Sequence, residues 1–318
     1  MRYDIVTFGI PMVEIMRKRL DCPFDEVGEF EGPYPAGDPG ICLYECVAMG
    51  YRGCYVGVVG DDPLGSCFLK QMERGGVDHS YIRKDPRHTT ATSLLAKFSD
   101  GSRSFVFTLP TSAAAQLGPE DFDEELLRNV RWVHVSGCAI SVSESIAKLH
   151  HMIMDFIGDD VTVSFDPNYR KEILGLDEYK KRCKKIYDRC NLFLPSEGEA
   201  VIFEPEAEND VEACRRTAAK GKMAALKLGA KGAYGFCGDR QIYDPGFPAE
   251  EIDPTGAGDT FSGALIASLM DGRDLFQSIV YGCAAGSLCV QRKGLMEIAP
   301  VRREVEELVN SRRKGADE

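Results

Sequence analysis

The sequence predicts one α/β domain over residues 1–318, with a mostly parallel central sheet, helices on both faces and a small separate β layer. Short apolar runs of the kind found in buried strands alternate with helix-length amphipathic segments from residue 132 onward. The length of 318 residues and the hydrophobic content of 44% are enough for one large core. Segments 11–35 and 88–110 break the alternation, and long irregular inserts in compact domains are often functional.

The N-terminal half is predicted to open with a buried strand. Glycine and proline mark a turn at 60–65, and alternating apolar residues on both sides of Asp100-Gly101 indicate a β-hairpin. Segment 11–35 shows no helical period, so we assign it with the hairpin to the separate β layer. The predicted strands are 5–9, 54–59, 92–97 and 104–108, and the predicted helices are 40–49 and 66 to about 74.

In the C-terminal half, three predicted strands in succession are each followed by a helix. This order is typical of a parallel sheet, because the crossover between parallel strands is usually a helix. The predicted strands are 132–136, 161–165, 192–194 and 224–228, followed by a small β region at 232–243. The predicted helices are 143–157, 177–188, 197–203, 209–220, 258–270, 274–290 and 301–312.

Composition excludes several classes of partner. The net charge of −12 argues against nucleic acid or an anionic membrane as a partner. No segment approaches the roughly 18 apolar residues that a membrane helix needs. The twelve cysteines include no C-x-x-C pair, which favours reduced thiols over zinc or disulfides. Because Met1 leads directly into a strand-like run, we expect no signal peptide and a cytoplasmic protein.

The most informative motif is the stretch 253–261, in which two glycines and an acid precede an apolar helix. A turn of small residues at the start of a helix exposes backbone N–H groups, and the helix dipole makes this end favourable for phosphate. A carboxylate at Asp259 makes sense there if it takes a proton from a hydroxyl that attacks a phosphoryl group. The alternative is that Asp259 and Thr260 only cap the helix.

Polar clusters follow several predicted strands directly. Ligands of parallel α/β sheets bind at the carboxyl ends of the strands, so these clusters are candidates for one common site. They are 166–170, 196–199, 229–232 and 253–259.

Gly256-Ala257-Gly258-Asp259 resembles the G-A-G-D anion-hole motif of the ribokinase/PfkB family of carbohydrate kinases, and 60–65 resembles the family's G-D-D-x-x-G turn. The resemblance extends over nearly the whole chain. It implies a ribokinase-like fold whose small β layer, at about 11–35 and 88–110, is a lid over a sugar. It also implies ATP and Mg²⁺, with Asp259 as catalytic base and the N–H groups of Gly256, Ala257 and Gly258 as the anion hole.

The resemblance further implies a nucleotide end. Ser196 to Glu199 is similar to the family's N-x-x-E segment, so Glu199 would act on Mg²⁺ through water, although Glu is also common in a first helical turn. Asp253 lies where many members bind a monovalent cation such as K⁺. Segment 229–232 is similar to the family's loop beside the adenine and ribose, and a plain β-turn is the alternative. The small residues at 282–286 could let the adenine lie close to the helix backbone, and close helix packing is the alternative. The cofactor-binding candidates are Ser196, Glu199, Lys227, Gly229, Lys231, Gly232 and Cys283.

The substrate end departs from the family. Glu14 stands at the spacing of a sugar-binding acid, and Gly37 fits the G-G-x-x-x-N motif. The motif's first glycine is Ala36, however, and its sugar-binding Asn is Ile41, which cannot make a hydrogen bond. Arg170, in a D-x-N-x-R segment, can clamp a carboxylate or phosphate, or form a surface ion pair. An Arg that sugar-acid kinases carry in the second lid strand has no match at 107–109.

The leading function is therefore ATP-dependent phosphorylation of a sugar or sugar acid, with fructose-like and keto-deoxy sugar-acid substrates nearest. A kinase of a nucleoside or polyol, or a non-catalytic ATP/sugar sensor on the same fold, remains open. A dinucleotide-binding dehydrogenase is disfavoured because no G-x-G-x-x-G follows the first strand. An exposed lid edge could pair with a second copy, so a homodimer through the lid is an option.

Overall fold

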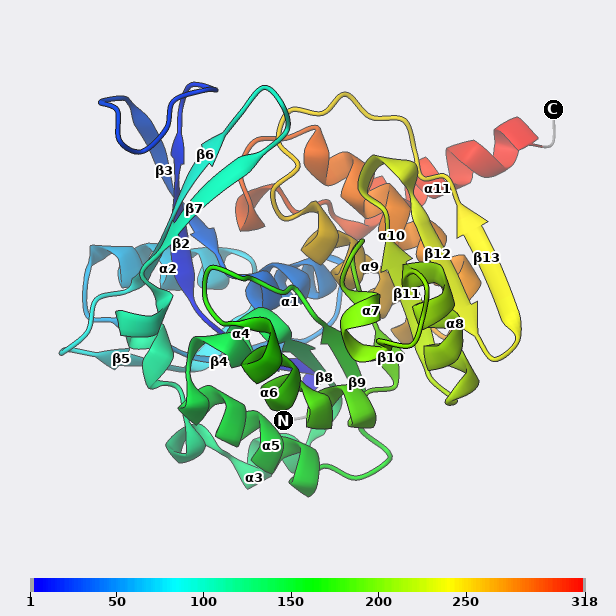
Figure 1. Ribbon diagram of the computed structural model, residues 1–318, viewed down its shortest axis with the longest axis horizontal. Coiled ribbons are helices and arrows are strands. Elements are labelled where there is room, and N and C mark those ends of the chain that lie inside the picture. The colour runs from blue at the N-terminus through cyan, green and yellow to red at the C-terminus, as the bar shows by residue number, and fades with distance from the viewer. Residues whose placement is uncertain (1–2, 317–318) are drawn as a thin grey trace.

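The protein is described here by a computed structural model, which gives the backbone of residues 3–316 and the side chains of residues 3–312. It confirms the predicted fold class. A nine-stranded sheet runs in the order β13-β12-β11-β10-β9-β8-β1-β4-β5, and a separate four-stranded sheet runs in the order β3-β2-β6-β7 (Figure 1).

All neighbours in the large sheet are parallel except at one edge, where β12 pairs antiparallel with β11 and with β13. The strands are β1 (Tyr3–Phe8), β4 (Gly53–Gly60), β5 (Asp78–Asp85), β8 (Val130–Ser136), β9 (Thr162–Asp166), β10 (Leu192–Phe193), β11 (Met223–Lys227), β12 (Ala233–Cys237) and β13 (Arg240–Asp244). Sequence reasoning did not predict β5. This edge strand carries four charged residues, so it lacks the apolar pattern of a buried strand.

The two faces of the large sheet are covered by two groups of helices (Figure 1). One group is α1 (Asp38–Ala48), α2 (Pro63–Arg74), α9 (Ala257–Met270), α10 (Leu275–Val290) and α11 (Arg302–Ala316). The other is α3 (Glu124–Arg128), α4 (Gly137–Val142), α5 (Glu144–Phe156), α6 (Leu176–Arg189), α7 (Ala200–Phe203) and α8 (Asp210–Ala219). Within the described residues, no helix is long and apolar enough to cross a membrane.

The small sheet is the predicted separate β layer. It contains β2 (Met12–Arg17), β3 (Phe30–Ala36), β6 (Ala91–Lys97) and β7 (Arg103–Phe107), and we call it the lid. Segment 11–35 thus supplies two strands that its mixed composition did not reveal. Strand β2 pairs parallel with β6 and antiparallel with β3, so each half of the lid is ordered by the other.

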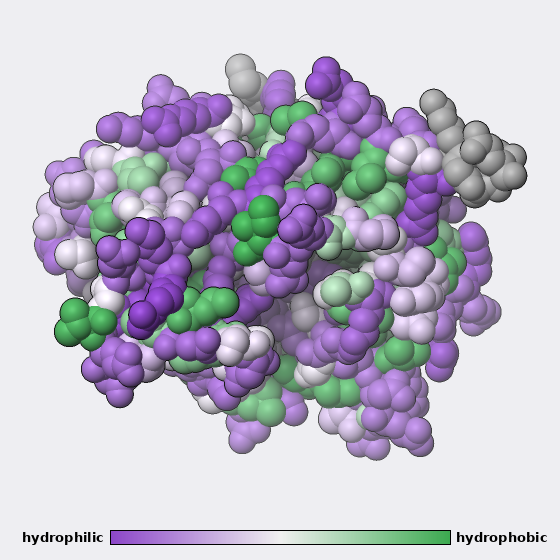
Figure 2. Space-filling model, turned by 90° about the horizontal axis from the view of Figure 1, so that it is seen from above, coloured by the Kyte–Doolittle hydropathy of each residue, from purple (hydrophilic) through white to green (hydrophobic). Residues whose placement is uncertain are grey.

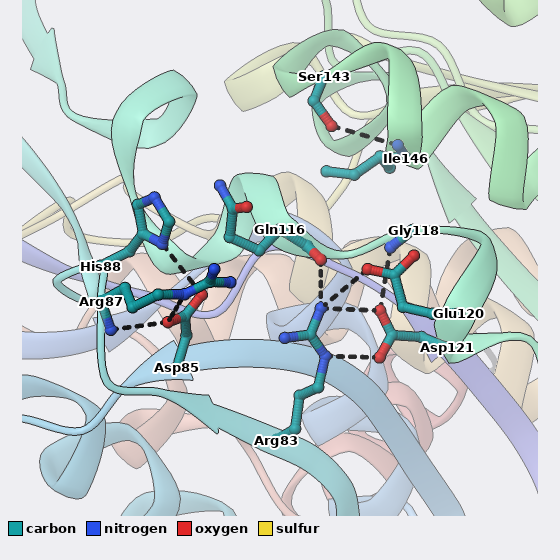
Figure 3. A network of polar contacts seen from close by, with 10 residues as sticks. All are labelled: Arg83, Asp85, Arg87, His88, Gln116, Gly118, Glu120, Asp121, Ser143 and Ile146. Atoms are coloured by element: carbon teal, nitrogen blue, oxygen red, sulfur yellow. Dashed lines mark hydrogen bonds and ion pairs between the residues drawn. The ribbon is translucent and has the colours of Figure 1, made fainter.

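Polar contacts at the edge of the large sheet hold the segments that enter and leave the lid (Figure 3). Arg83 of β5 donates from Nε to Asp121 Oδ1 over 2.7 Å and also bonds the carbonyl of Gln116. Asp85 accepts from the backbone N–H of Arg87 at 2.7 Å and pairs with His88 at 3.0 Å. These contacts connect the segments on both sides of the lid hairpin to the edge of the large sheet.

Helices α1 and α9 approach closely because Gly263 has no side chain. A Cβ at Gly263 would lie 2.5 Å from the carbonyl oxygen of Cys42 and 2.6 Å from Cβ of Glu45. Such distances are far below van der Waals contact. The glycine therefore sets the depth at which α9, and the turn before it, sits against α1.

The same interface buries Glu45 completely, and neither carboxylate oxygen has a hydrogen-bond partner among the described residues. Burial raises the pKa of Glu45 well above 4.5, opposed by Arg292 and reinforced by Glu304. Because folding raises the pKa of Glu45, the folded state binds this proton more tightly than the unfolded chain does. The free energy of unfolding therefore falls as pH rises above the pKa that Glu45 has in the unfolded state.

We expect Glu45→Gln to be more stable than wild type at pH 8 and equally stable near pH 4. The difference should grow by up to about 1.4 kcal/mol per pH unit above the unfolded pKa. Urea unfolding across this range measures it, with the exposed Glu307→Gln on α11 as a control. Parallel pH profiles for wild type and Glu45→Gln would contradict the argument.

Candidate active site

A cavity of about 460 Å³ opens at the carboxyl ends of β9, β10 and β11, within the size range of small-molecule sites. The molecule seen from above is mainly hydrophilic and hollowed near its centre (Figure 2). Three of the four predicted clusters meet there. The lining residues from these clusters include Asp166, Arg170, Ser196, Glu199, Gly256, Gly258 and Asp259.

The turn before α9 presents backbone donors to the cavity. Gly256 has φ 78°, a left-handed conformation that glycine adopts without strain, and it precedes the first helical residue. Among the described residues, the N–H groups of Gly256, Gly258 and Asp259 have no acceptor, whereas Ala257 donates weakly to the Pro254 carbonyl at 3.4 Å. The helix start thus offers an anion-binding concavity.

Asp259 lies in the first turn of α9 and lines the cavity, where the residue as a whole is partly exposed. Its carboxyl group is nevertheless largely desolvated by the surrounding protein, which raises its pKa well above 3.8, and the neighbouring carboxylates of Asp38 and Asp166 add to this effect. Lys227 and Arg170 act in the opposite direction. A carboxylate with a raised pKa binds a proton more readily, which suits a general base.

Asp166 at the end of β9 and Lys227 at the end of β11 form a buried ion pair, with 3% and 8% of each residue exposed. Burial opposes the charge on Lys227, but Asp166 and Glu199 outweigh it and raise the pKa of the ammonium group. Ser262 of α9 donates to Asp166 at 3.2 Å and to the carbonyl of Gly258 at 3.0 Å. Two strands and the helix start are therefore connected through one carboxylate.

Glu199 connects two strand-end loops. Its Oε1 accepts from the backbone N–H of Tyr169 and its Oε2 from that of Ser196, both at 2.8 Å. Burial raises the pKa of Glu199, followed by repulsion from Asp166, while Lys227 and the two N–H groups lower it. Sequence reasoning assigned Glu199 only to a metal, so this structural role is additional.

Residues 3–312 contain no group of three His, Cys, Asp or Glu side chains that could hold a metal ion by themselves. Mg²⁺ in phosphate sites commonly uses one or two carboxylates with waters and substrate phosphates, and it does not need a protein cage. Glu199 lines the cavity and retains lone pairs on both oxygens. Its position therefore fits the predicted contact with Mg²⁺ through water.

The predicted monovalent-cation ligand, Asp253, is 1% exposed and is bonded within the protein. Its Oδ1 accepts from Lys97 Nζ of the lid at 2.5 Å and from the hydroxyl and N–H of Thr255 at 2.7 and 3.0 Å. Its Oδ2 has no partner among the described residues. A lysine ammonium thus already lies against this carboxylate.

The predicted substrate residues lie around the start of α1 and in the lid. Glu14 of β2 is 6% exposed with Oε1 unpartnered, and burial raises its pKa to about 7. Gly37 has φ 113°, and a Cβ there would lie 2.5 Å from the Ile10 carbonyl oxygen. Ile41 packs beside Gly256, where an added Cβ would lie 3.5 Å from its Cδ1. Of the predicted set, Arg170 lines the cavity, and Glu14, Gly37 and Ile41 do not.

Several predicted nucleotide residues lie outside the lining of this cavity. Gly232 has φ 86°, and a Cβ there would clash with the Asp244 carbonyl oxygen. The geometry of the turn is therefore a sufficient reason for this glycine. Lys231 forms an exposed ion pair with Glu197 at 3.0 Å. Gly229 precedes them in the same turn, and Cys283 is 7% exposed within α10.

Sequence reasoning missed one residue that lines the cavity, Arg103, and one acid near Asp259, Asp38. Asp38 accepts from Asn168 at 2.8 Å and from Ser136, its Oδ1 is buried without a partner, and burial raises its pKa to about 6. Arg103, in the second lid strand, lines the cavity four residues before the stretch searched for an arginine. An acid in the first turn of a helix and an arginine in a hairpin are common, so neither stood out.

Comparison with known proteins identifies the relatives of this chain. The family profile described as "pfkB family carbohydrate kinase" matches residues 46–302. Fructokinase of Escherichia coli is 29% identical over 299 residues, covering 90% of this chain and 96% of that one. 2-Dehydro-3-deoxygluconokinase of Bacillus subtilis is 26% identical, covering 98% and 97%. A solved structure from E. coli, a putative ribokinase II in complex with ATP and Mg²⁺, has TM-score 0.90 at 29% identity, covering 97% of this chain and 99% of that one.

We expect Lys227→Met to lower the free energy of unfolding by about 3–5 kcal/mol, because it leaves Asp166 buried without its counter-ion. Lys231→Met, which removes an exposed pair, should cost no more than about 1 kcal/mol. Urea denaturation of both variants measures the difference. Asp166→Asn combined with Lys227→Met should recover part of the loss, and equal effects of the two lysine variants would refute the argument.

Proposed function

This chain belongs to the pfkB family of carbohydrate kinases, and we propose that it transfers the γ-phosphoryl group of ATP to a hydroxyl of a sugar or sugar-like molecule. The observation that carries the proposal is the juxtaposition of Asp259 with unbonded N–H groups at the start of α9, in one cavity. A base and an anion hole side by side are the two devices that phosphoryl transfer to an alcohol requires.

Asp259 is the base of the proposed reaction. The acceptor hydroxyl oxygen forms a bond to the γ-phosphorus as the bond to the β,γ-bridging oxygen breaks, ADP leaves, and the hydroxyl proton goes to the Asp259 carboxylate. The raised pKa of Asp259 makes this proton transfer more favourable. Because the carboxylate lies in the first helical turn, it is held close to the donors that face the phosphoryl oxygens.

The N–H groups of Gly256 and Gly258, together with the N-terminal end of the α9 dipole, would stabilise charge on the transferring phosphoryl group. The guanidinium of Arg170 lines the same cavity and forms no ion pair within residues 3–312. Mg²⁺ bound with ATP would neutralise phosphate charge, and Glu199 would hold one of its waters. Ser196, whose backbone N–H donates to Glu199, also lines the cavity and is a further candidate for a nucleotide contact.

The acceptor would bind between the start of α1 and the lid. Glu14 offers an unpartnered carboxylate oxygen for a sugar hydroxyl, and Asp38 offers a second close to Asp259. Ile41 supplies an apolar contact in place of the amide common in the family. Fructose-like sugars and keto-deoxy sugar acids are the first candidates, because relatives are named for them. Nucleosides and polyols are further candidates.

A panel of sugars, sugar acids, polyols and nucleosides, assayed for ADP release and for the phosphorylated product, tests this function. At least one compound should stimulate ATP turnover with stoichiometric product. Binding of ATP without stimulation by any compound would favour the alternative, a non-catalytic sensor on the same fold.

We expect Asp259→Asn to lower kcat by about 10²–10⁴, the usual contribution of a general base, with melting temperature and ATP affinity nearly unchanged. Coupled assays with calorimetric titration of ATP measure both quantities. Glu197→Gln, at an exposed acid of the cavity rim, is the matched control. Turnover of Asp259→Asn at the wild-type rate would eliminate the mechanism.

The pH dependence should report the environment of Asp259. Burial, and after it the carboxylate of Asp38, raises the pKa of Asp259, so kcat/KM should rise with pH as Asp259 loses its proton. Removing that charge by Asp38→Asn lowers this pKa, so the acid limb should move to lower pH. An amide oxygen can still accept from Ser136 and Asn168. An acid limb unchanged in Asp38→Asn would show that another group controls it.

A further inference from the structure

The lid is joined to the segment before α9 by an ion pair between residues 156 positions apart in the chain. Lys97, the last residue of β6, lies with its Nζ 2.5 Å from Oδ1 of Asp253. Asp253 is almost completely buried, whereas 22% of the lysine side chain is exposed. A buried carboxylate without a cation is costly, so Lys97 stabilises the charged form of Asp253.

The backbone of Lys97 is held on both sides of the hairpin tip. Its carbonyl accepts from the N–H of Asp21 at 3.0 Å, and Oδ1 of Asp21 accepts from the N–H of Ser99 at 2.9 Å. The antiparallel register pairs Lys97 with Arg103 across the hairpin. An ordered backbone therefore carries the ammonium group to its carboxylate.

Asp253 also orders the segment that forms the anion hole. The oxygen that bonds Lys97 accepts from the hydroxyl and the N–H of Thr255, at 2.7 and 3.0 Å. The N–H of Asp253 donates to the Val290 carbonyl, at the end of α10, at 3.0 Å. Gly256, whose N–H has no acceptor among the described residues, follows Thr255 directly. The carboxylate thus holds the turn that presents the phosphate donors.

These contacts test whether a free monovalent cation, which the family resemblance implies at Asp253, fits this chain. Oδ1 already accepts three bonds, one of them from a cation with the same charge as K⁺. Oδ2 has no partner among the described residues, but K⁺ at this oxygen would lie beside the ammonium group and share its single counter-ion. Like charges at such short range repel. The residues therefore fit the ammonium group and do not fit a second cation.

The other charged groups near this carboxylate are already balanced. Glu14 of β2 has the cations of Lys97 and Arg103 as neighbours. Lys293, on the chain after α10, also lies near the carboxylate, but its ammonium group pairs with Glu31 of β3 at 2.5 Å. Each of these acids thus has a cation beside it without any free ion.

We propose that the Lys97 ammonium group is a built-in cation of the site, which keeps Asp253 charged and the anion hole in its phosphate-binding form. Phosphoryl transfer in this protein then needs no free monovalent cation and depends instead on the lid hairpin that carries Lys97. The inference rests on the proposed function and extends it. Lys97 is absent from the cavity lining, so it is a positioning residue. A lysine ammonium group suits this role because it is a compact point charge with three donors.

The first test measures phosphoryl transfer in potassium chloride and in choline chloride at equal concentration, because choline is too large to replace K⁺. Wild type should have the same kcat in both salts. Lys97→Ala in choline chloride should lower kcat by about 10²-fold, the effect that a displaced group at an active site can have. Potassium should recover much of this loss, since it can occupy the space that the ammonium group leaves. Lys97→Met fills that space with an uncharged side chain, so it should stay slow in both salts.

Lys293→Ala is the matched control. It also removes an ammonium group that connects the lid to the rest of the protein, through Glu31, but it leaves the cation on Asp253. Its kcat should therefore not depend on the choice of salt. A potassium response as large as that of Lys97→Ala would show that any loosening of the lid produces the effect.

Thermal unfolding gives a second readout that needs no turnover. A cation that binds only the folded state raises Tm as its concentration rises. Potassium, relative to choline, should therefore raise the Tm of Lys97→Ala more than that of wild type or Lys97→Met. If wild type phosphorylates no acceptor, the proposed function fails, and this comparison still decides whether Lys97 replaces the cation.

Other results would overturn the proposal. Several-fold stimulation of wild type by potassium would show that Asp253 takes a free cation beside Lys97. A loss in Lys97→Ala that potassium does not recover would make Lys97 an ordinary lid contact, and wild-type kcat in choline chloride would show that the anion hole needs no cation at Asp253. The wild-type comparison requires no variant, so it decides the question even if Lys97→Ala does not fold.

Discussion

The buried ion pair between Asp166 and Lys227 is the contact on which the site depends. Asp166 ends β9 and Lys227 ends β11, so the pair connects the carboxyl ends of two strands that lie on either side of β10. Ser262 extends this contact to the first turn of α9, from which Asp259 and the unbonded N–H groups face the cavity. Breaking such a pair is costly because it leaves an uncompensated buried charge.

The charged groups around Asp259 also set its affinity for a proton. Burial raises the pKa of Asp259, Asp38 and Asp166 raise it further, and Lys227 and Arg170 limit the rise. A base surrounded only by cations would hold a proton too weakly, and one surrounded only by acids would stay protonated. The site therefore combines carboxylates that favour proton uptake with cations and N–H donors that attract phosphate.

The lid shows where sequence reasoning reached its limit. Its hairpin was predicted from alternation around Asp100-Gly101, which is a local signal. Strands β2 and β3 were not predicted, because their pairing with each other and with β6 depends on residues far apart in the chain. The placements of Lys97 at Asp253 and Arg103 at the cavity follow from that pairing, so neither could be predicted.

The sequence alone determined the fold class, the anion-hole motif and the polar clusters at strand ends, because strand and helix periodicity and glycine turns are encoded by neighbouring residues. Only the tertiary structure decided which clusters share a cavity. It brought Asp38 of α1 beside Asp259 of α9, gave Glu199 two backbone partners, and left 229–232 outside the lining. These outcomes depend on sheet order and on the close approach of α1 and α9 at Gly263, which are set by contacts between distant segments.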